Sequence, residues 1–428
     1  MPHATVSKSE LKGSIDPPPS LELACRCIWA ASLGDGGAYG NCPNHPDIKS
    51  IISVAEQLGA NIEFQKGTAD IFGSQEPKQI PQILCNNSSR ASRLCLPLAL
   101  TFSTITSLKD ISIPSPATAW LDEAANQLGI RITKTQGEIS ISGPPSKNWL
   151  ELSNRAGAYW LEGFMFAIPQ LDTTEYMLQL DDFISMHPSF SYTREAYRIF
   201  EIGYYYDEQS RVLTLPAFQF YNSQYMDIPP SWKEASYYMG AFLLCGQGEV
   251  KVPNYSHQPE KDFWLIFHVI KSISASEDGN SHHVRTSLPL RLPKQLDPRP
   301  YPSLIPLMVL LATQAQEPVE IAPLYPLSPL ARKRLLLSCR ELEKIGAKIS
   351  MASSQIIISP SKLIGGKADS HGDSRIAMAL VLAGLICKNP LHIEGVDAIN
   401  KANKNFLSDL KLLGAKIKYP HLKVGVFS

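Results

Sequence analysis

Five segments of the chain share one pattern of apolar and polar positions. Apolar residues recur at i, i+3, i+4 and i+7, which marks one buried face of a helix. In each segment the helical pattern stops at a glycine, within Leu-Gly-Ala or a close variant, and a few further residues follow. The segments are HPDIKSIISVAEQLGANIEF, SPATAWLDEAANQLGIRI, YTREAYRIFEIGY, ARKRLLLSCRELEKIGAKIS and NKNFLSDLKLLGAKIKY, with glycines at Gly59, Gly129, Gly203, Gly346 and Gly414. Such a glycine predicts a helix C-cap that leads into a strand.

A second and more apolar helical pattern alternates with the first. Its members are apolar on nearly every side, which is typical of helices buried at the centre of a layer. They are LELACRCIWAASLG, SRASRLCLPLALT, RAGAYWLEGFMFAIP, WKEASYYMGAFLLCG, YPSLIPLMVLLAT and SRIAMALVLAGLI. The alternation predicts two kinds of helix in every repeat.

The two patterns together define a repeat of about 71 residues. A weaker copy of the first helix, EKDFWLIFHVIKSI, lacks the glycine and fills the one missing position, near residue 272. Short β runs such as GEISISG and QIIISP stand between the helices. The unit is too long for a solenoid repeat. We therefore expect an α/β fold of six small folding units grouped into two domains.

Composition narrows the possible functions. The 428 residues include 44% apolar residues, and 40 Lys+Arg balance 40 Asp+Glu, so the net charge is zero. A nucleic-acid binder usually carries a basic excess, which this chain lacks. No apolar run reaches the length of about 18 residues that a membrane span needs, and the first residues do not resemble a signal peptide. The eight cysteines are scattered without a C-x-x-C pair, which predicts free thiols in a reducing cytoplasm.

One segment near the C-terminus carries a family resemblance. The sequence HGDSRIAMA at 371–379 is similar to the Asp-His-Arg-Met-Ala-Met signature of the enolpyruvyl transferases, and within them of the EPSP synthases. The resemblance implies two domains, one of residues 1–13 plus 228–428 and one of residues 14–227. Each would hold three βαβαββ repeats around buried parallel helices, with the active site in the cleft between the domains.

The resemblance also implies a reaction. Family members transfer the enolpyruvyl group of phosphoenolpyruvate (PEP) to a hydroxyl through a tetrahedral ketal, without a metal or another cofactor. For this chain it implies PEP and a small, shikimate-like hydroxyl acceptor as partners, a monomer in the cytoplasm, and a place in aromatic amino acid biosynthesis through the shikimate pathway. Neither nucleic acid nor a membrane is expected as a partner.

The cations of the family motifs are retained. Those that the family aims at the carboxylate and phosphate of PEP match Arg93, Arg334, Arg375 and Lys401. Arginine forks suit such groups because they form bidentate, charge-assisted bonds. Arg26 also matches, and a lone arginine in the apolar run LELACRCIWAAS needs a partner. Asp373 matches too, and its simplest role is to brace the neighbouring loop or Arg375.

The groups for proton transfer are not retained. The lysine, aspartate and glutamate of the family motifs fall on Leu21, Ser303 and Ala331, none of which replaces them as an acid or base. The Ser-Ser-Gln that holds the acceptor's phosphate falls on residues 157–159, read Gly-Ala-Tyr. Asp297 is the one acid left near the lost aspartate, either as a loop residue or as a substitute base.

Three functions stay open at this point. The chain is a carboxyvinyl transferase with relocated acid and base groups, a relative with a changed reaction or acceptor, or a non-catalytic homologue that binds a small anion. His257, His282 and His283 could be read as metal ligands. No cysteine or carboxylate spacing supports a metal site, so the segment SEDGNSHHVRT is predicted to be a solvated polar loop.

Overall fold

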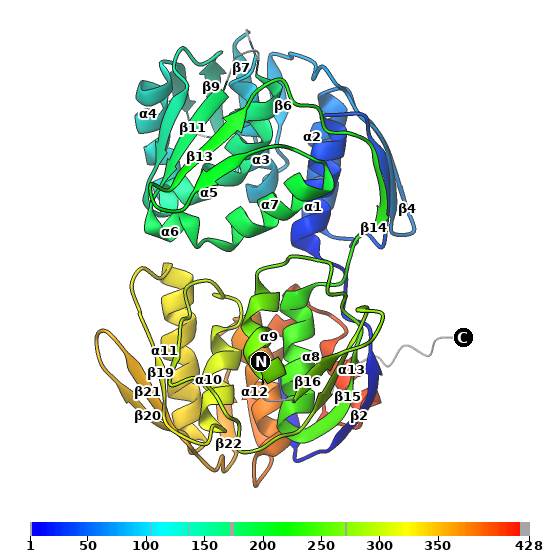
Figure 1. Ribbon diagram of the computed structural model, residues 1–428, viewed down its shortest axis with the longest axis vertical. Helices are drawn as coiled ribbons and strands as arrows, with labels where there is room; N and C mark the ends of the chain where they lie inside the picture. The colour runs from blue at the N-terminus through cyan, green and yellow to red at the C-terminus, as the bar shows by residue number, and fades with distance from the viewer. Residues whose placement is uncertain (1, 103, 136, 172–174, 270–271, 420–428) are drawn as a thin grey trace. The chain divides into compact units, whose positions relative to one another are not determined.

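The computed structural model describes the chain except for residues 1, 103, 136, 172–174, 270–271 and 420–428. The contacts between residues divide it into two compact units (Figure 1). Unit 1 comprises Met1–Pro18 and Pro230–Ser428, and unit 2 comprises Pro19–Pro229. The chain passes between the units at Pro17–Pro19 and at Pro229–Pro230, where prolines mark loops.

Three four-stranded sheets form the outside of unit 2. In each sheet one pair of strands is parallel and the other pairs are antiparallel. The sheets are β14-β3-β5-β4 (Gln224–Asp227, Gly37–Gly40, Thr68–Phe72, Asn61–Gln65), β6-β7-β9-β8 (Gln82–Leu84, Thr106–Lys109, Glu138–Ser142, Arg131–Thr135) and β10-β11-β13-β12 (Trp149–Leu152, Glu175–Leu180, Val212–Pro216, Tyr205–Asp207).

The helices of unit 2 fall into the two predicted kinds. The apolar ones, α1 (Leu21–Ser32), α3 (Ser89–Ala99) and α5 (Asn154–Ala167), pack in the core. The amphipathic ones are α2 (Pro46–Gln57), α4 (Ser115–Leu128) and α7 (Pro188–Ile199), and two short helices, α6 (Asp182–Ser185) and η1 (Ile168–Gln170), complete the unit.

Unit 1 repeats this plan and draws in the N-terminal strands. β1 lies between β23 and β24, and β2 pairs in parallel with β15. The sheets are β22-β23-β1-β24 (Gly366–Asp369, Leu391–Glu394, His3–Ser7, Lys416–Lys418), β16-β17-β15-β2 (Ile273–Ala275, His282–Arg285, Gly246–Val250, Leu11–Ile15) and β18-β19-β21-β20 (Gln295–Leu296, Val319–Ile321, Ile356–Ser359, Lys348–Met351).

The helices of unit 1 follow the same division. The apolar helices α8 (Trp232–Cys245), α10 (Ile305–Thr313) and α12 (Ser374–Ile386) form its core. The others are α9 (Glu260–Val269), α11 (Pro329–Lys344) and α13 (Phe406–Leu412), with the 3₁₀ helix η2 (Val396–Lys401). All six apolar segments and all six amphipathic ones are therefore helices, as the sequence predicts, and the α/β repeat is confirmed.

The N-terminal ends of several helices are fixed by polar caps. Ser20 Oγ accepts a hydrogen bond from Leu23 N, and Ser231 Oγ accepts one from Glu234 N, each at 3.3 Å. Such caps satisfy backbone N–H groups that a helix leaves unpaired. Asp373 caps α12 in the same way, with bonds of 2.8 and 3.2 Å.

Three local predictions need comment. Gly59, Gly346 and Gly414 each lie just past a helix with φ between 108° and 110°, so these glycines do end their helices. Gly203 does not, since α7 ends earlier, at Ile199. The solvated loop predicted for SEDGNSHHVRT is confirmed only in part, at residues 276–280. His282 lies instead in β17 with no exposed surface, and it can be buried because its ring nitrogens are hydrogen-bonded to Val252 O and Asn254 Oδ1.

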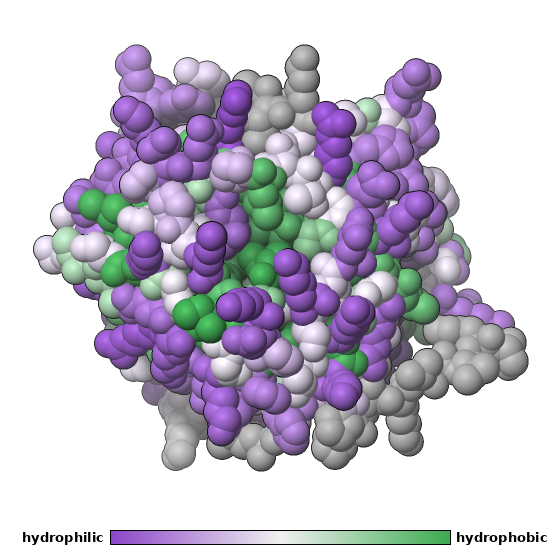
Figure 2. Space-filling model, turned by 90° about the horizontal axis from the view of Figure 1, so that it is seen from below, coloured by the Kyte–Doolittle hydropathy of each residue, from purple (hydrophilic) through white to green (hydrophobic). Residues whose placement is uncertain are grey.

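The face shown in Figure 2 is mainly hydrophilic, with apolar residues gathered near its middle. None of the described helices has the length and apolarity that a membrane crossing requires.

All eight cysteines are free, and seven of them are buried, as predicted for unpaired core thiols.

Candidate functional site

Arg26 lies on the buried side of α1 and has no exposed side-chain surface. Its Nη2 lies 3.0 Å from Glu162 Oε2, and its Nη1 lies 3.2 Å from Glu22 Oε2. It also donates hydrogen bonds to Ser189 Oγ (2.9 Å) and Thr193 Oγ1 (3.2 Å). The partner that the sequence required for Arg26 is thus mainly Glu162, and every nitrogen of the guanidinium is occupied.

Arg93 of α3 contacts the same carboxylate as Arg26, that of Glu162. Its Nη2 lies 2.8 Å from Glu162 Oε2, and its side chain is 20% exposed. Two buried atoms of this group have no hydrogen-bond partner among the described residues, Arg93 Nε and Glu162 Oε1. Burial by itself would raise the pKa of Glu162, but the arginines Arg26, Arg93 and Arg90 outweigh it and lower that pKa.

Arg90 completes the charged group of unit 2. It donates to both oxygens of Glu22 (2.9 and 3.2 Å), and its Nε lies 3.4 Å from Asp47 Oδ2. Three arginines are therefore opposed by three carboxylates. We call this set the unit-2 cluster: Glu22, Arg26, Asp47, Arg90, Arg93 and Glu162. Its formal charge is zero, and Arg93 is the most exposed of its three arginines.

Arg375 begins the charged group of unit 1. It makes a bidentate pair with Glu234 of α8, with Nη2–Oε1 at 2.6 Å and Nη1–Oε2 at 2.9 Å. Its guanidinium lies 5.6 Å from the centroid of the Tyr237 ring. Burial would lower the pKa of Arg375, but the charge of Glu234 raises it. Arg375 is therefore a paired, buried cation.

Arg334 and Asp373 form the second pair of unit 1. Arg334 Nε donates to Asp373 Oδ2 at 2.8 Å, while Asp373 Oδ1 caps α12. Both side chains are about 15% exposed. Asp373 thus braces both its helix and Arg334, and we call Glu234, Arg334, Asp373 and Arg375 the unit-1 cluster.

Lys401 and Asp297 lie outside both clusters. Lys401 is exposed at the end of η2, and α13 starts only at Phe406. Both oxygens of Asp297 accept hydrogen bonds from the Arg299 guanidinium, at 2.7 to 3.1 Å. A base at Asp297 would have to act while bound to this arginine.

The comparison with known proteins decides the family. The profile of the family described as EPSP synthase (3-phosphoshikimate 1-carboxyvinyltransferase) matches residues 6–410. This chain belongs to the EPSP synthase family.

Individual relatives support this assignment over the whole length. The chain is 25% identical to the 3-phosphoshikimate 1-carboxyvinyltransferase of Chlamydia trachomatis serovar L2, over 97% of this chain and 95% of that protein. It is 24% identical to the enzyme of that name from Methanosarcina mazei, over 97% and 98%. Relatives of this family are carboxyvinyl transferases by name.

Solved structures share the fold. EPSP synthase from Acinetobacter baumannii superimposes with a TM-score of 0.79 at 17% identity, over 97% of this chain and 99% of that one. The enolpyruvyl transferase NikO from Streptomyces tendae gives a TM-score of 0.72 at 14% identity, over 97% and 98%. The two-domain fold predicted from the repeats and the resemblance is therefore that of the EPSP synthase family.

The structure describes the surroundings of Leu21, Ser303 and Ala331, which the resemblance assigns to the family's proton-transfer positions. Leu21 packs against the core of unit 2, and Ala331 is 1% exposed in the first turn of α11. Ser303 contributes its carbonyl oxygen to Tyr237 Oη, at 2.8 Å. None of the three side chains can supply or accept a proton as lysine, aspartate or glutamate does.

Residues 157–159, which the resemblance assigns to the binding of the acceptor's phosphate, make contacts within the protein. Gly157 and Ala158 are buried, and Tyr159 Oη lies 2.9 Å from Ser89 Oγ and donates to the carbonyl oxygens of Ser89 and Ser112. The hydroxyl of Tyr159 is therefore occupied by the protein itself.

The sequence predicts Asp373, but it did not predict Arg90 or the other carboxylates of the two clusters. Glu162 stands alone in the apolar run YWLEGFMF, and Glu234 stands in WKEASYYMG. The signal that marked Arg26, a lone charge in an apolar helix, applies equally to these glutamates, because buried charges require partners.

Proposed function

We propose that this chain binds PEP and transfers its carboxyvinyl group to the hydroxyl of a small acceptor. The observation that carries the proposal is membership of the EPSP synthase family together with the retained cations Arg93, Arg334, Arg375 and Lys401.

The exposed and the buried cations would have different roles in ligand binding. Arg93, Arg334 and Lys401 have exposed surface and would contact the carboxylate and phosphate of PEP. Arg26 and Arg375 would act through the carboxylates that they hold, since their guanidinium groups are buried and paired. Asp373 would orient Arg334 toward the anion.

The reaction requires a base and an acid. The base takes the proton of the acceptor hydroxyl as its oxygen bonds to C2 of PEP, and the acid adds a proton to the methylene carbon. The C2–O bond to phosphate then breaks, and loss of one proton from the new methyl group restores the vinyl group. We propose Asp297 as the base, displaced from Arg299 when substrate binds. Each missing group ordinarily costs about 10²–10⁴ in rate, so slow turnover is expected.

A second candidate function is anion binding without this transfer, or with a different acceptor. Two observations favour it: Leu21, Ser303 and Ala331 at the positions of the acid and base groups, and Tyr159 at the acceptor-phosphate position. An acceptor without a phosphate group would fit the changed position 157–159.

Calorimetric titration tests the proposal. Purified protein is titrated with shikimate 3-phosphate and then with PEP, and inorganic phosphate is measured in the same samples. Binding of both with release of phosphate is expected for the transferase, and D297N should bind PEP normally while releasing phosphate at least tenfold more slowly. Binding of PEP alone would point to another acceptor. No binding of either compound would contradict the proposal.

A further inference from the structure

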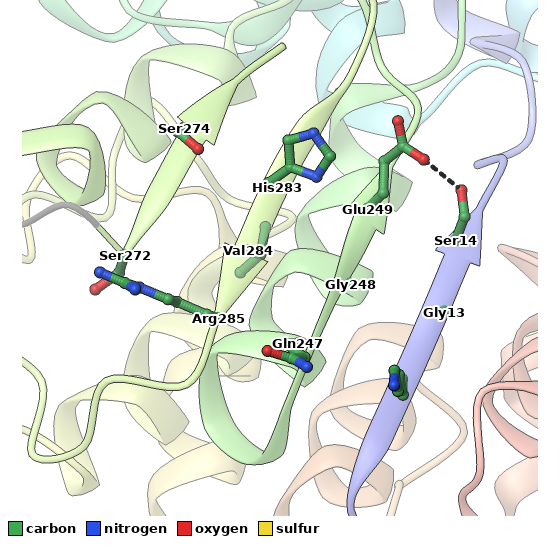
Figure 3. A pocket seen from close by; sticks show the side chains of 11 residues that line it. Gly13, Ser14, Gln247, Gly248, Glu249, Ser272, Ser274, His283, Val284 and Arg285 are labelled. Carbon is green, nitrogen blue, oxygen red and sulfur yellow. Dashed lines mark hydrogen bonds between the residues drawn. The ribbon is translucent and has the colours of Figure 1, made fainter.

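The outer face of one sheet in unit 1 carries a set of polar side chains that the proposed function does not use. The sheet is β16-β17-β15-β2, and its face borders a cavity of about 720 Å³ (Figure 3). A volume of this size lies within the range of about 300–1,000 Å³ found for small-molecule sites.

Strand register arranges these side chains in two rows. In the first row Ser274, His283, Glu249 and Ser14 lie opposite one another on successive strands. Glu249 accepts hydrogen bonds from Ser14 Oγ (3.0 Å) and Ser281 Oγ (2.6 Å). These bonds lower the pKa of Glu249, so it is charged at neutral pH. The carboxylate of this row is thus already bound by the protein.

The second row has free donors. Arg285, Gln247 and Lys12 lie opposite one another on β17, β15 and β2. All three are exposed, and no ion pair or side-chain hydrogen bond of theirs occurs among the described residues. This distinguishes the row from the arginines of both clusters, each of which is paired with a carboxylate.

Ser272 adds an independent observation. It is 2% exposed, lines the same cavity and has a buried Oγ without a hydrogen-bond partner in the described part of the chain. Figure 3 shows its hydroxyl beside the Arg285 side chain. Buried polar atoms are almost always hydrogen-bonded, so an unpaired one beside a free guanidinium indicates a missing oxygen acceptor.

We propose that this row binds a small molecule with two anionic groups. Arg285 and Ser272 hold one group, Lys12 holds the other, and the Gln247 amide donates between them. The α-carbons of Lys12 and Arg285 lie two strand spacings apart, roughly 9–10 Å, which sets the separation of the two groups. Glu249 repels an anion from the first row and confines it to the second.

The experiment uses a bisphosphate and its matched monophosphate as probes. The full chain is titrated calorimetrically with fructose 1,6-bisphosphate and with fructose 6-phosphate in low salt. The bisphosphate is expected to bind about tenfold more tightly, because two charge-assisted contacts replace one. R285Q should weaken its binding about tenfold, K12Q about fivefold and S272A about threefold, all without loss of folding, because the first two side chains are exposed and S272A removes only an unpaired hydroxyl.

Two controls separate this site from others. K348Q removes an exposed lysine from a different cavity of unit 1, lined also by Leu288 and Ile364, and should leave bisphosphate binding unchanged. R93Q removes an arginine of the proposed PEP site and should also leave it unchanged.

The inference stands apart from the proposed function. It fails if the two probes bind equally, if R285Q and K12Q bind like the parent protein, or if R93Q alone abolishes bisphosphate binding. Failure of PEP binding leaves it intact.

Discussion

The two charged clusters hold their arginines in different ways. In the unit-2 cluster one buried carboxylate oxygen, Glu162 Oε2, is bound by both Arg26 and Arg93. Arg93 Nε and Glu162 Oε1 have no hydrogen-bond partner among the described residues. In the unit-1 cluster each arginine is paired with a different carboxylate, Arg375 with Glu234 and Arg334 with Asp373. Loss of Glu162 would therefore remove a partner from two arginines of unit 2, whereas loss of Glu234 or Asp373 would affect one arginine of unit 1.

This difference bears on ligand binding. Neither cluster presents an excess of positive charge, so a PEP-type anion has to compete with carboxylates of the protein. In unit 2 the anion would compete with Glu162 for Arg93, whose Nη2 is bound to that carboxylate, whose Nε has no partner among the described residues, and whose side chain is partly exposed. In unit 1 it centres on Arg334, because Arg375 is fully engaged. The following predictions test that contrast.

The largest expected effect is on stability, from Glu162→Ala. It leaves Arg26 buried without its main partner and frees Arg93, and loss of one partner from a buried pair costs about 3–5 kcal/mol. Glu234→Ala isolates only Arg375 and should fall at the lower end of that range. Urea unfolding of both variants measures the difference.

The matched control is Glu138→Ala, which removes a half-buried partner 3.9 Å from Lys109. It should change stability by less than about 0.5 kcal/mol. If Glu162→Ala resembled this control, the shared-carboxylate interpretation would be wrong.

The next effect is on anion binding. Arg93→Gln should weaken PEP binding by about 1–3 kcal/mol, since the exposed guanidinium would make a charge-assisted bond to the ligand. Arg375→Gln should chiefly lower stability and weaken PEP binding less. Calorimetry with PEP and urea unfolding of the same samples separate the two results. Equal losses of binding with unchanged stability would place Arg375 on the anion instead.

A pH effect follows from His187, whose ring caps α7 by accepting a bond from Ser189 N. Burial, with Arg93 and Arg26 nearby, lowers its pKa from 6.5 to about 4. The unfolded chain therefore binds a proton in this range that the folded chain does not. Stability should fall by about 1.4 kcal/mol per pH unit as the pH drops from 6.5 toward 4.

His187→Asn tests this slope, because asparagine retains an acceptor for the cap but does not titrate. Urea unfolding at pH 6.5, 5.5 and 4.5 should show that the free energy of unfolding of this variant changes less steeply with pH, by the contribution of one proton, about 1.4 kcal/mol per pH unit. An unchanged slope in His187→Asn would show that His187 titrates normally.

Glu162 affects stability in a different pH range. Its pKa is lowered from 4.5, so its contribution is present above that pH and is lost at more acid values.

The smallest effects concern the helix caps of unit 1. Ser328→Ala removes the bond from Ala331 N to Ser328 Oγ and should cost about 1 kcal/mol. Asp373→Ala removes a cap and also frees Arg334, so its cost should be larger. Thermal unfolding compares the two. Equal costs would mean that the Arg334–Asp373 pair adds nothing to the cap.

Much of the fold could be predicted from the sequence. Apolar positions spaced at three and four residues mark the amphipathic helices, and continuous apolar runs mark the buried ones, because burial on one face or on all faces follows directly from that spacing. Gly59, Gly346 and Gly414 marked helix ends because a positive φ favours glycine. His282 was misread, since nothing in a polar segment reveals that one of its residues will find two buried partners.

The sequence by itself determined the six repeats, the two kinds of helix and the need of Arg26 for a partner. Only the tertiary structure decided which residues neutralise the arginines. Glu162 lies 69 residues beyond Arg93 and Glu234 lies 141 residues before Arg375, so no local spacing connects them. The packing of α3 against α5 brings Arg93 to Glu162, and the packing of α8 against α12 brings Glu234 to Arg375. The pattern of apolar positions along one segment indicates which of its faces is buried, whereas ion pairs between helices depend on how the segments pack together.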